Sequence, residues 1–426
     1  MIKSIPKNKQ VIISISYGNY LKSNGGTDKV ILEHQTFFNE AGISYIFLYP
    51  FKRKYFGIDL LSYSIILDGI EIAEYLSEKE IYSYFEDIYK QKYSFIGFFV
   101  HHLMGNSIES LRSLLSSIQI PTYVYLHDYY TCCPQYNLLK NDEYYCDPLN
   151  KMRCSHCKYI ESAQSNILEY KKLFGDVKER LTVIAPSQKC AEIWLHFYPE
   201  YTSNIRVILH QKMIKIDRGI QFTNKKLRMA FIGRQEFCKG WSVWKMIVEL
   251  INKNNLPYDL YYFGTGLEQL ENVKNSVVMF KAGNTNSMIE ALTENQIDVV
   301  ALLSNWPETY SYTLYEAIAS NCYVLTNNDS GNIENQVTSN RWGIVYNNDE
   351  ELKKLILDYN KVQQLVINYR KECTNYFDII PNSEELIEMV KNKNFNSIID
   401  FPVRKNTHLA LRMIRTLKKV EKQIKG

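Results

Sequence analysis

Residues 297–326 read IDVVALLSNWPETYSYTLYEAIASNCYVLT, and this segment predicts a strand, a loop, a short helix and a second strand. The apolar run 299–303 is typical of a buried strand, and the pattern over 312–320 favours a helix. In open α/β sheets, ligands bind at the carboxyl ends of the strands. The polar loop between the strand and the helix is therefore expected to line a binding crevice.

Two carboxylates, Glu308 in this loop and Glu316 in the helix, have seven residues between them. The free backbone N–H groups near Ser311, Tyr312 and Thr313, at the start of the helix, can bind an anion. This arrangement suits a ligand that carries both a phosphate and sugar hydroxyls. Glutamate pairs at this spacing also arise by chance, so the interpretation depends on the rest of the chain.

A basic segment upstream supplies a partner for such a phosphate. The apolar run 227–232 predicts a strand that ends in Gly233 and Arg234, and Lys239 and Gly240 precede the next helical pattern. Backbone N–H groups, a guanidinium and an ammonium around one strand-to-helix turn can converge on a diphosphate. The alternative is a solvated basic loop.

The first half of the chain alternates strand-type and helical patterns, which predicts a parallel sheet. Its first predicted strand runs into a loop with Gly25 and Gly26, where the backbone can approach a ligand closely. His127 follows the predicted strand 122–126, and a histidine at a strand end can bond sugar hydroxyls. The alternative for His127 is a structural histidine; we favour that alternative for His101.

Five of the nine cysteines fall between positions 132 and 157. Thiolates that include a C-x2-C pair can hold a tetrahedral zinc ion, and four thiolates leave no open position for catalysis. Buried free thiols in a long insertion are the alternative, and Cys132 or His156 could replace a ligand. The predicted ligands of this structural zinc site are Cys133, Cys146, Cys154 and Cys157.

The E-x7-E segment, with Leu314, Tyr315, Glu316 and Ala317, resembles that of retaining glycosyltransferases of family 4 (glycosyltransferase group 1), which have the GT-B fold. The G-R…K-G segment at 233–240 closely resembles the diphosphate-binding segment of these enzymes. The HHLMG and HDYY…CP segments resemble members that act in bacterial surface polysaccharide synthesis. The resemblance covers nearly the whole chain before its basic tail.

The resemblance implies an α/β protein with two Rossmann-like domains that face one cleft. Residues 1–211 would form the acceptor-side domain, with a Cys-rich insertion at about 129–160. Residues 212–395 would form the nucleotide-sugar-binding domain, and 396–426 a basic amphipathic tail. The implied reaction moves a sugar from a UDP, GDP or dTDP sugar to a hydroxyl of a lipid-linked glycan, with retention and without a catalytic cofactor.

The resemblance also implies a role for each site residue. Arg234 and Lys239 would stabilise the leaving diphosphate, and His127 would contact sugar hydroxyls from the facing domain. Glu308 would bind the donor sugar and Glu316 the ribose. The glycine loop would lie near the diphosphate and the acceptor, and Gly264 would line the nucleotide pocket.

Two segments depart from the family pattern. Tyr310-Ser311-Tyr312 stands where the family has a glycine shortly after the first glutamate, and 209–211 reads Leu-His-Gln instead of a Pro-Asn-Gly type loop. Both departures bear on the sugar pocket, and so on the identity of the donor, more than on the fold.

The tail 404–425 combines eight Lys or Arg side chains with an apolar stripe of helical spacing. A helix of this type can lie on an anionic membrane surface. Packing against the first domain and oligomerisation are the alternatives. With no signal segment or membrane-spanning run in the sequence, we expect a cytoplasmic protein, peripheral on the inner face of the cell membrane.

Composition and motifs leave two other classes of function to consider. The net charge of +4 is too small to indicate a nucleic-acid partner. A catalytically silent GT-B protein that serves another transferase as partner or regulator is one alternative. A Rossmann oxidoreductase is the other, but no G-x-G-x-x-G follows the first predicted strand.

Overall fold

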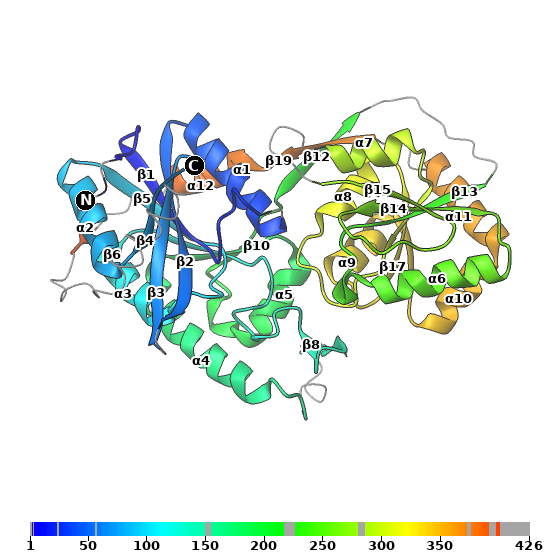
Figure 1. Cartoon of the computed structure of the whole chain (residues 1–426), viewed down its shortest axis with the longest axis horizontal. Coiled ribbons are helices and arrows are strands. Elements are labelled where there is room, and N and C mark those ends of the chain that lie inside the picture. The colour runs from blue at the N-terminus through cyan, green and yellow to red at the C-terminus, as the bar shows by residue number, and fades with distance from the viewer. Residues whose placement is uncertain are drawn as a thin grey trace.

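The computed structural model describes residue 2 and residues 4–23, 25–55, 58–149, 155–216, 226–279, 286–372, 376–391 and 398–400. Two α/β domains lie side by side, each around its own sheet, and an antiparallel ribbon connects them (Figure 1). The predicted fold class, two Rossmann-like domains, is confirmed. The basic tail, 404–425, lies outside the described residues.

The first domain contains an eight-stranded sheet in the order β11-β10-β7-β5-β1-β2-β3-β4. The six strands from β11 to β2 pair in parallel, as predicted. Strand β10 is buried along its whole length, which is why four of its five residues are apolar. The strands are β1 (Gln10–Ile15), β2 (Ile43–Tyr55), β3 (Ile58–Leu67), β4 (Ile70–Leu76), β5 (Ser94–Val100), β7 (Thr122–Tyr125), β10 (Leu181–Ala185) and β11 (Ile205–Val207).

Helices and short ordered segments connect these strands. The helices are α1 (Gly26–Glu40), α2 (Glu78–Lys90), α3 (Ile108–Ser117), α4 (Ile160–Asp176) and α5 (Gln188–Phe197), with single 3-10 turns η1 (Lys178–Arg180) and η2 (Pro199–Tyr201). The Cys-rich segment holds one small hairpin of β8 (Leu139–Lys140) and β9 (Tyr144–Tyr145).

The antiparallel strands β3 and β4 correct the purely parallel sheet that we predicted. They are joined by Asp68 and Gly69, whose φ angles are 49° and 83°. Positive φ at both central residues is the geometry of a tight hairpin turn, and Asp-Gly is a preferred sequence for it. The Asp-Gly pair between two apolar runs was therefore the sequence signal for this hairpin.

The second domain contains a six-stranded sheet, parallel throughout, in the order β15-β14-β13-β16-β17-β18. The segment 297–326 forms β16, α8 and β17, so the predicted order of elements is confirmed. The strands are β13 (Leu227–Ile232), β14 (Tyr258–Gly264), β15 (Val273–Val277), β16 (Val299–Leu302), β17 (Tyr323–Asn327) and β18 (Gly343–Tyr346). The helices are α6 (Trp241–Lys253), α7 (Ser287–Glu294), α8 (Tyr312–Ala319), α9 (Asn332–Asn340), α10 (Asp349–Leu357) and α11 (Tyr359–Glu372), with a 3-10 turn η3 (Phe237–Lys239).

The chain passes between the domains through a two-stranded antiparallel ribbon, in which β12 (Gln211–Ile216) pairs with β19 (Tyr376–Pro381). After β19, helix α12 (Ser383–Lys391) returns to the first domain, where Leu386 and Val390 pack in the same core cluster as Val30. Figure 1 shows α12 beside α1. This helix falls within the range 212–395 that the sequence assigned to the second domain, because an amphipathic pattern does not reveal which domain receives its apolar face.

Strand β20 (Ile398–Ile399), near the end of the described residues, pairs with β6 (Ile118–Gln119) of the first domain.

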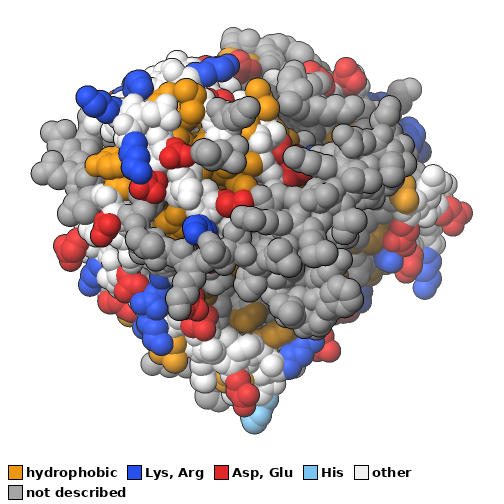
Figure 2. Space-filling view, turned by 60° about the vertical axis from the view of Figure 1, so that its left-hand side comes forward, with side chains coloured by type: hydrophobic (Ala, Val, Ile, Leu, Met, Phe, Trp, Pro, Cys, Tyr) orange, Lys and Arg blue, Asp and Glu red, His pale blue; other side chains and the backbone are white. Residues whose placement is uncertain are grey.

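Among the described residues, no helix is long and apolar enough to cross a membrane. On the face shown in Figure 2, acidic and basic side chains of the described residues are interspersed with hydrophobic ones.

Gly240 provides a test of the turn that carries the basic segment. Its φ is +79°, and a Cβ atom there would lie 2.0 Å from the carbonyl oxygen of Leu303. We expect Gly240→Ala to lower stability by about 2 kcal/mol or more, measured as a lower melting temperature. Gly18→Ala is the matched control, since a Cβ atom at Gly18 meets nothing within 4 Å. Equal melting temperatures for the two variants would contradict this geometry.

Candidate functional site

Loops that follow strands of both sheets meet at the domain boundary. The Thr309 hydroxyl, in the loop after β16, donates a 2.7 Å hydrogen bond to the carbonyl oxygen of His127, just after β7. A Cβ atom on Gly25 would lie 3.6 Å from an Nη atom of Arg234. The structure therefore brings the glycine loop and the basic segment, which are far apart in sequence, to opposite sides of one boundary.

The glycine loop is held by the first turn of α1. The backbone N–H of Gly25 donates to Asp28 at 3.0 Å, and the hydroxyl of Tyr17 donates to the same carboxylate oxygen at 3.1 Å. Burial and the Asp28 charge raise the pKa of Tyr17 to about 12, so its hydroxyl keeps its proton. Gly26 lies against the other domain, because a Cβ atom there would be 3.8 Å from the ring of Tyr312.

Arg234 and Lys239 present two different cations to the boundary. The Arg234 side chain is 57% exposed and pairs with Glu236 at 3.2 Å. The Lys239 side chain is 33% exposed, and its ammonium lies 2.5 Å from Glu308. Burial acts to lower the pKa of Lys239, but the Glu308 carboxylate opposes this and the net direction is upward. Lys239 is therefore a firmly protonated group with a fixed position.

Glu308 is buried, and the hydrogen bonds that its carboxylate accepts from the described residues all fall on one oxygen. Oε1 accepts from the Ser304 hydroxyl at 2.6 Å, the Trp306 indole N–H at 3.1 Å and the Lys239 ammonium at 2.5 Å. Among the described residues, no side chain or backbone group donates to Oε2. The carboxylate is thus fixed in orientation through one oxygen, and the other can accept a bond from a ligand.

The start of α8 has the features of an anion site. Ser311 has a φ of +70°, a left-handed conformation that glycine adopts without strain. Ser311 lies in the segment where the family pattern has glycine, so this chain adopts a backbone conformation typical of glycine with a serine. In the part of the chain that the structure describes, no side chain caps the first N–H groups of α8, at Tyr312 and Thr313, and such groups attract anions.

Glu316 lies one turn further along α8 and faces the first domain. Its nearest cation is Lys29 of α1, with 3.8 Å between Nζ and Oε1. Burial raises the pKa of Glu316, and the Lys29 charge opposes this rise. Tyr312 also reaches across, since its hydroxyl donates to Glu33 of α1 at 3.5 Å.

Gly233 and Gly264 place two strand ends together. A Cβ atom on Gly264 would lie 2.1 Å from the carbonyl oxygen of Gly233, so only glycine permits this approach. Gly233 itself has a φ of +116°. The ends of β13 and β14 therefore meet directly beside Arg234.

His127 belongs to a column of stacked aromatic rings at the boundary. Its Nε2 lies 2.9 Å from Nδ1 of His101, and its ring stacks on His210 with 5.8 Å between centroids. Burial and the neighbouring His210 hold the pKa of His127 well below its usual value. His127 is thus a neutral imidazole, whose Nδ1 is the nitrogen that remains for a ligand hydroxyl.

His102 and Asp128 also follow predicted strands of the first domain, but the sequence did not predict that they pair. His102 Nε2 lies 2.7 Å from the Asp128 carboxylate, while His102 Nδ1 accepts the backbone N–H of Met104 at 3.0 Å. Because Nδ1 accepts a hydrogen bond, the ring proton lies on Nε2, and this N–H donates a hydrogen bond to Asp128. The ring of Tyr17 packs edge-on against His102 at 5.2 Å. The signal was that His102 and Asp128 each follow the end of a parallel strand, β5 or β7.

The predicted zinc ligands have different environments. Cys146 is buried in the main apolar core of the first domain, whereas Cys133 and Cys157 are partly exposed. Among the described residues, no three His, Cys, Asp or Glu side chains group closely enough to hold a metal ion. Cys154 lies outside the described residues, so the structural zinc site stays a prediction.

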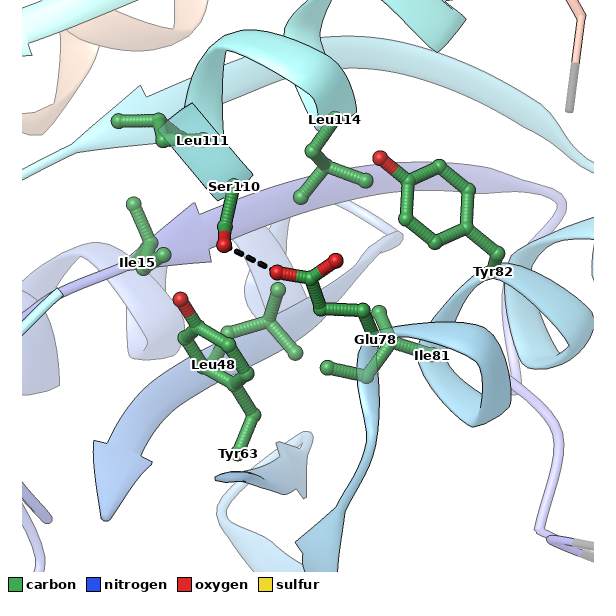
Figure 3. A pocket seen from close by; sticks show the side chains of 9 residues that line it. All are labelled: Ile15, Leu48, Tyr63, Glu78, Ile81, Tyr82, Ser110, Leu111 and Leu114. Atoms are coloured by element: carbon green, nitrogen blue, oxygen red, sulfur yellow. Dashed lines mark hydrogen bonds between the residues drawn. The ribbon is translucent and has the colours of Figure 1, made fainter. Parts of the chain in front are cut away.

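A small cavity under α2 and α3 lies apart from this boundary (Figure 3). Its volume is about 20 Å³, which suits at most one water molecule. Inside it, the Ser110 hydroxyl donates to the Glu78 carboxylate among apolar side chains. A cavity of this size is a packing feature and cannot hold a sugar.

No protein-family model matches the sequence, and no curated protein matches it. Sucrose-phosphate synthase from Thermosynechococcus elongatus is 12% identical, with a TM-score of 0.52 over 85% of this chain and 93% of that chain. WaaG, a glycosyltransferase involved in lipopolysaccharide biosynthesis, is 10% identical, with a TM-score of 0.51 over 90% and 100%. TarM is 13% identical, with a TM-score of 0.51 over 80% of this chain and 63% of that chain. These likenesses show that the chain has the GT-B fold.

Glu33 makes the boundary sensitive to pH. Burial raises its pKa from 4.5 to about 7, against the opposing effect of Lys29. An acid whose pKa is raised by folding stabilises the protein fully below its unfolded pKa, and this contribution is lost as pH rises through about 7.

We expect Glu33→Gln to remove this dependence, so that the variant melts higher than the wild type at pH 8 by the equivalent of roughly 1–3 kcal/mol. The measurement is the melting temperature between pH 4.5 and 8. Glu40→Gln, at an exposed position of the same helix, is the control. A Glu33→Gln profile parallel to that of the wild type would show that Glu33 does not titrate in this range.

Proposed function

We propose that this chain, which has the GT-B fold, is a glycosyltransferase that moves a sugar from a nucleotide-diphosphate sugar to an acceptor hydroxyl. The observation that supports this most is the Lys239–Glu308 ion pair beside the uncapped start of α8. It joins a fixed cation, a fixed carboxylate and free backbone N–H groups at the boundary of two domains. Such a set fits a ligand with a diphosphate at one end and sugar hydroxyls at the other.

The proposed roles follow from charge and position. Negative charge develops on the diphosphate as it leaves the sugar, and donors fixed before the reaction stabilise such charge best. Arg234 supplies a planar fork of donors and Lys239 a point charge. The N–H groups of Tyr312 and Thr313 add uncharged donors from the start of α8. Glu316, one turn further, is assigned to the ribose hydroxyls.

Two residues contact the donor sugar in this proposal. Glu308 uses its second oxygen, while its first keeps Lys239 in place. His127 approaches from the first domain as a neutral imidazole, which can donate or accept at a sugar hydroxyl. Holding a carboxylate by three bonds on one oxygen leaves its orientation unchanged when the ligand arrives.

The acceptor and the stereochemistry are finer parts of the same proposal. The family resemblance supports retention without a catalytic metal. WaaG acts in lipopolysaccharide biosynthesis and shares the fold, and the HDYY…CP segment at 127–134 resembles surface-polysaccharide enzymes. These two likenesses support a glycan acceptor, lipid-linked and reached at the membrane by the basic tail 404–425.

The alternative is a catalytically silent GT-B protein, which would bind a nucleotide sugar without turning it over. The presence of Arg234, Lys239 and Glu316, which the proposal assigns to the diphosphate and the ribose, argues against it. Binding and turnover must therefore be measured separately.

A thermal-shift panel of UDP, GDP and dTDP sugars tests the donor site. We expect one nucleotide class to raise the melting temperature, since a ligand at 100 times its Kd stabilises a protein by about 2.7 kcal/mol. Lys239→Met should lose most of this shift, measured against its own ligand-free melt. Lys353→Met, which removes an exposed ion pair with Glu350, should keep it.

The release of nucleoside diphosphate from the donor that this panel selects is then measured, because it distinguishes a transferase from a catalytically silent protein. Turnover that Lys239→Met abolishes supports the transferase. Binding without turnover, with every acceptor class supplied, would support the silent protein. A folded wild type that no nucleotide sugar stabilises would refute the donor site.

A further inference from the structure

The contact between α1 and α8 is built around one lysine. Lys29 reaches from the first domain to within 3.8 Å of Glu316, and the two side chains are only 7% and 12% exposed. Its ammonium also lies 4.2 Å from the centre of the Tyr312 ring. Lys29 therefore interacts with both a carboxylate and an aromatic face of the second domain, out of contact with most of the solvent.

Other contacts fix the two helices around this lysine. Tyr312 donates to Glu33, which is one turn after Lys29 on the same face of α1. On the other side, the ring of His210 stacks on that of Tyr312 with an interplanar angle of 13°. His210 is neutral, because burial lowers its pKa to about 3. Among the described residues, the titratable groups that face the Lys29–Glu316 pair include Glu33, His210, Tyr310 and Tyr312.

The chemistry of the ribose site requires a charged carboxylate. An ionised carboxylate accepts bonds on both oxygens, whereas a protonated one turns one oxygen into a donor. Burial favours the protonated form of Glu316, and the Lys29 charge opposes it. The cation that opposes protonation comes from the other domain, so it acts on Glu316 only while α1 is docked on α8.

A purely structural ion pair is a weak explanation of this arrangement. A buried pair often stabilises a protein no more than apolar side chains of the same volume, because both charges lose their hydration. Lys29 follows Gly25 and Gly26 by one turn of α1, so it belongs to the helix that carries the glycine loop. Its position links that loop to the second domain.

We propose that Lys29 is a positioning residue that acts through Glu316: it holds the Glu316 carboxylate aimed for the nucleotide ribose, so that nucleotide affinity depends on docking of the first domain. This inference rests on the proposed function. It adds that the nucleotide site of the second domain is incomplete without α1. A residue of the acceptor-side domain then sets the affinity for the donor.

Titration calorimetry with UDP, GDP and dTDP tests the inference in Lys29→Met, Lys29→Arg, Glu316→Gln and the double variant Lys29→Met/Glu316→Gln. We expect Lys29→Met to weaken the affinity for the nucleotide that the wild type binds by about tenfold, within the usual range of coupling between sites. Lys29→Arg should recover most of it. In the Glu316→Gln background, Lys29→Met should have no further effect, because the carboxylate through which it acts is gone.

Kinetics distinguish a positioning role from a general loss of structure. Lys29→Met should raise the KM for the donor while kcat changes much less, since the proposal gives Lys29 no contact with the diphosphate or the reacting carbon. Lys90→Met, which removes an exposed pair with Glu86 on α2, is the matched control and should alter neither constant.

The outcomes separate this inference from the proposed function. If the wild type binds a nucleotide and Lys29→Met binds it equally or more tightly, the inference is wrong and the donor site stands. An undiminished effect of Lys29→Met in the Glu316→Gln background would also overturn it. If the wild type binds none of the three nucleotides, the proposed function fails and the inference fails with it.

Discussion

Two carboxylates at the domain boundary, the buried Glu308 and the largely buried Glu316, constrain the rest of the structure. A buried charge is costly unless a partner of opposite sign lies close to it. Glu308 finds that partner in its own domain, as Lys239, and Glu316 finds it in the other domain, as Lys29. The first pair fixes the basic segment against β16, and the second holds α1 against α8. These pairs set the positions of the cations and carboxylates of the candidate site, while apolar contacts, such as that of Tyr312 with the core of the first domain, also hold the domains together.

Much of the second domain could be predicted because its signals are local. The apolar runs at 227–232 and 299–303 form strands, and Gly233, Gly240 and Gly264 lie where the backbone turns sharply or approaches another strand. Backbone conformation at such points depends on neighbours in sequence, so the pattern reveals it. The position of Arg234 and Lys239 beside a strand end follows from the same local logic.

The parts that could not be predicted depend on contacts between distant segments. Lys29 lies in the first turns of α1, and the sequence of that helix does not show that Glu316 of the other domain will lie next to it. The His102–Asp128 pair joins two strand ends that become neighbours only when the sheet order is known. The destination of α12 depends on which core offers a matching apolar surface. Ser311 could not be predicted for another reason. Its backbone is left-handed, a conformation that a glycine would have indicated and a serine does not.

We propose that a nucleoside diphosphate binds where the basic segment, the start of α8 and Glu316 meet. Hydrogen–deuterium exchange, with and without the tightest binder among UDP, GDP and dTDP, tests this most directly. We expect slower exchange at residues 233–240 and 311–316, and at the start of α1, when the nucleotide is bound. Binding that slows exchange only in other segments would contradict it.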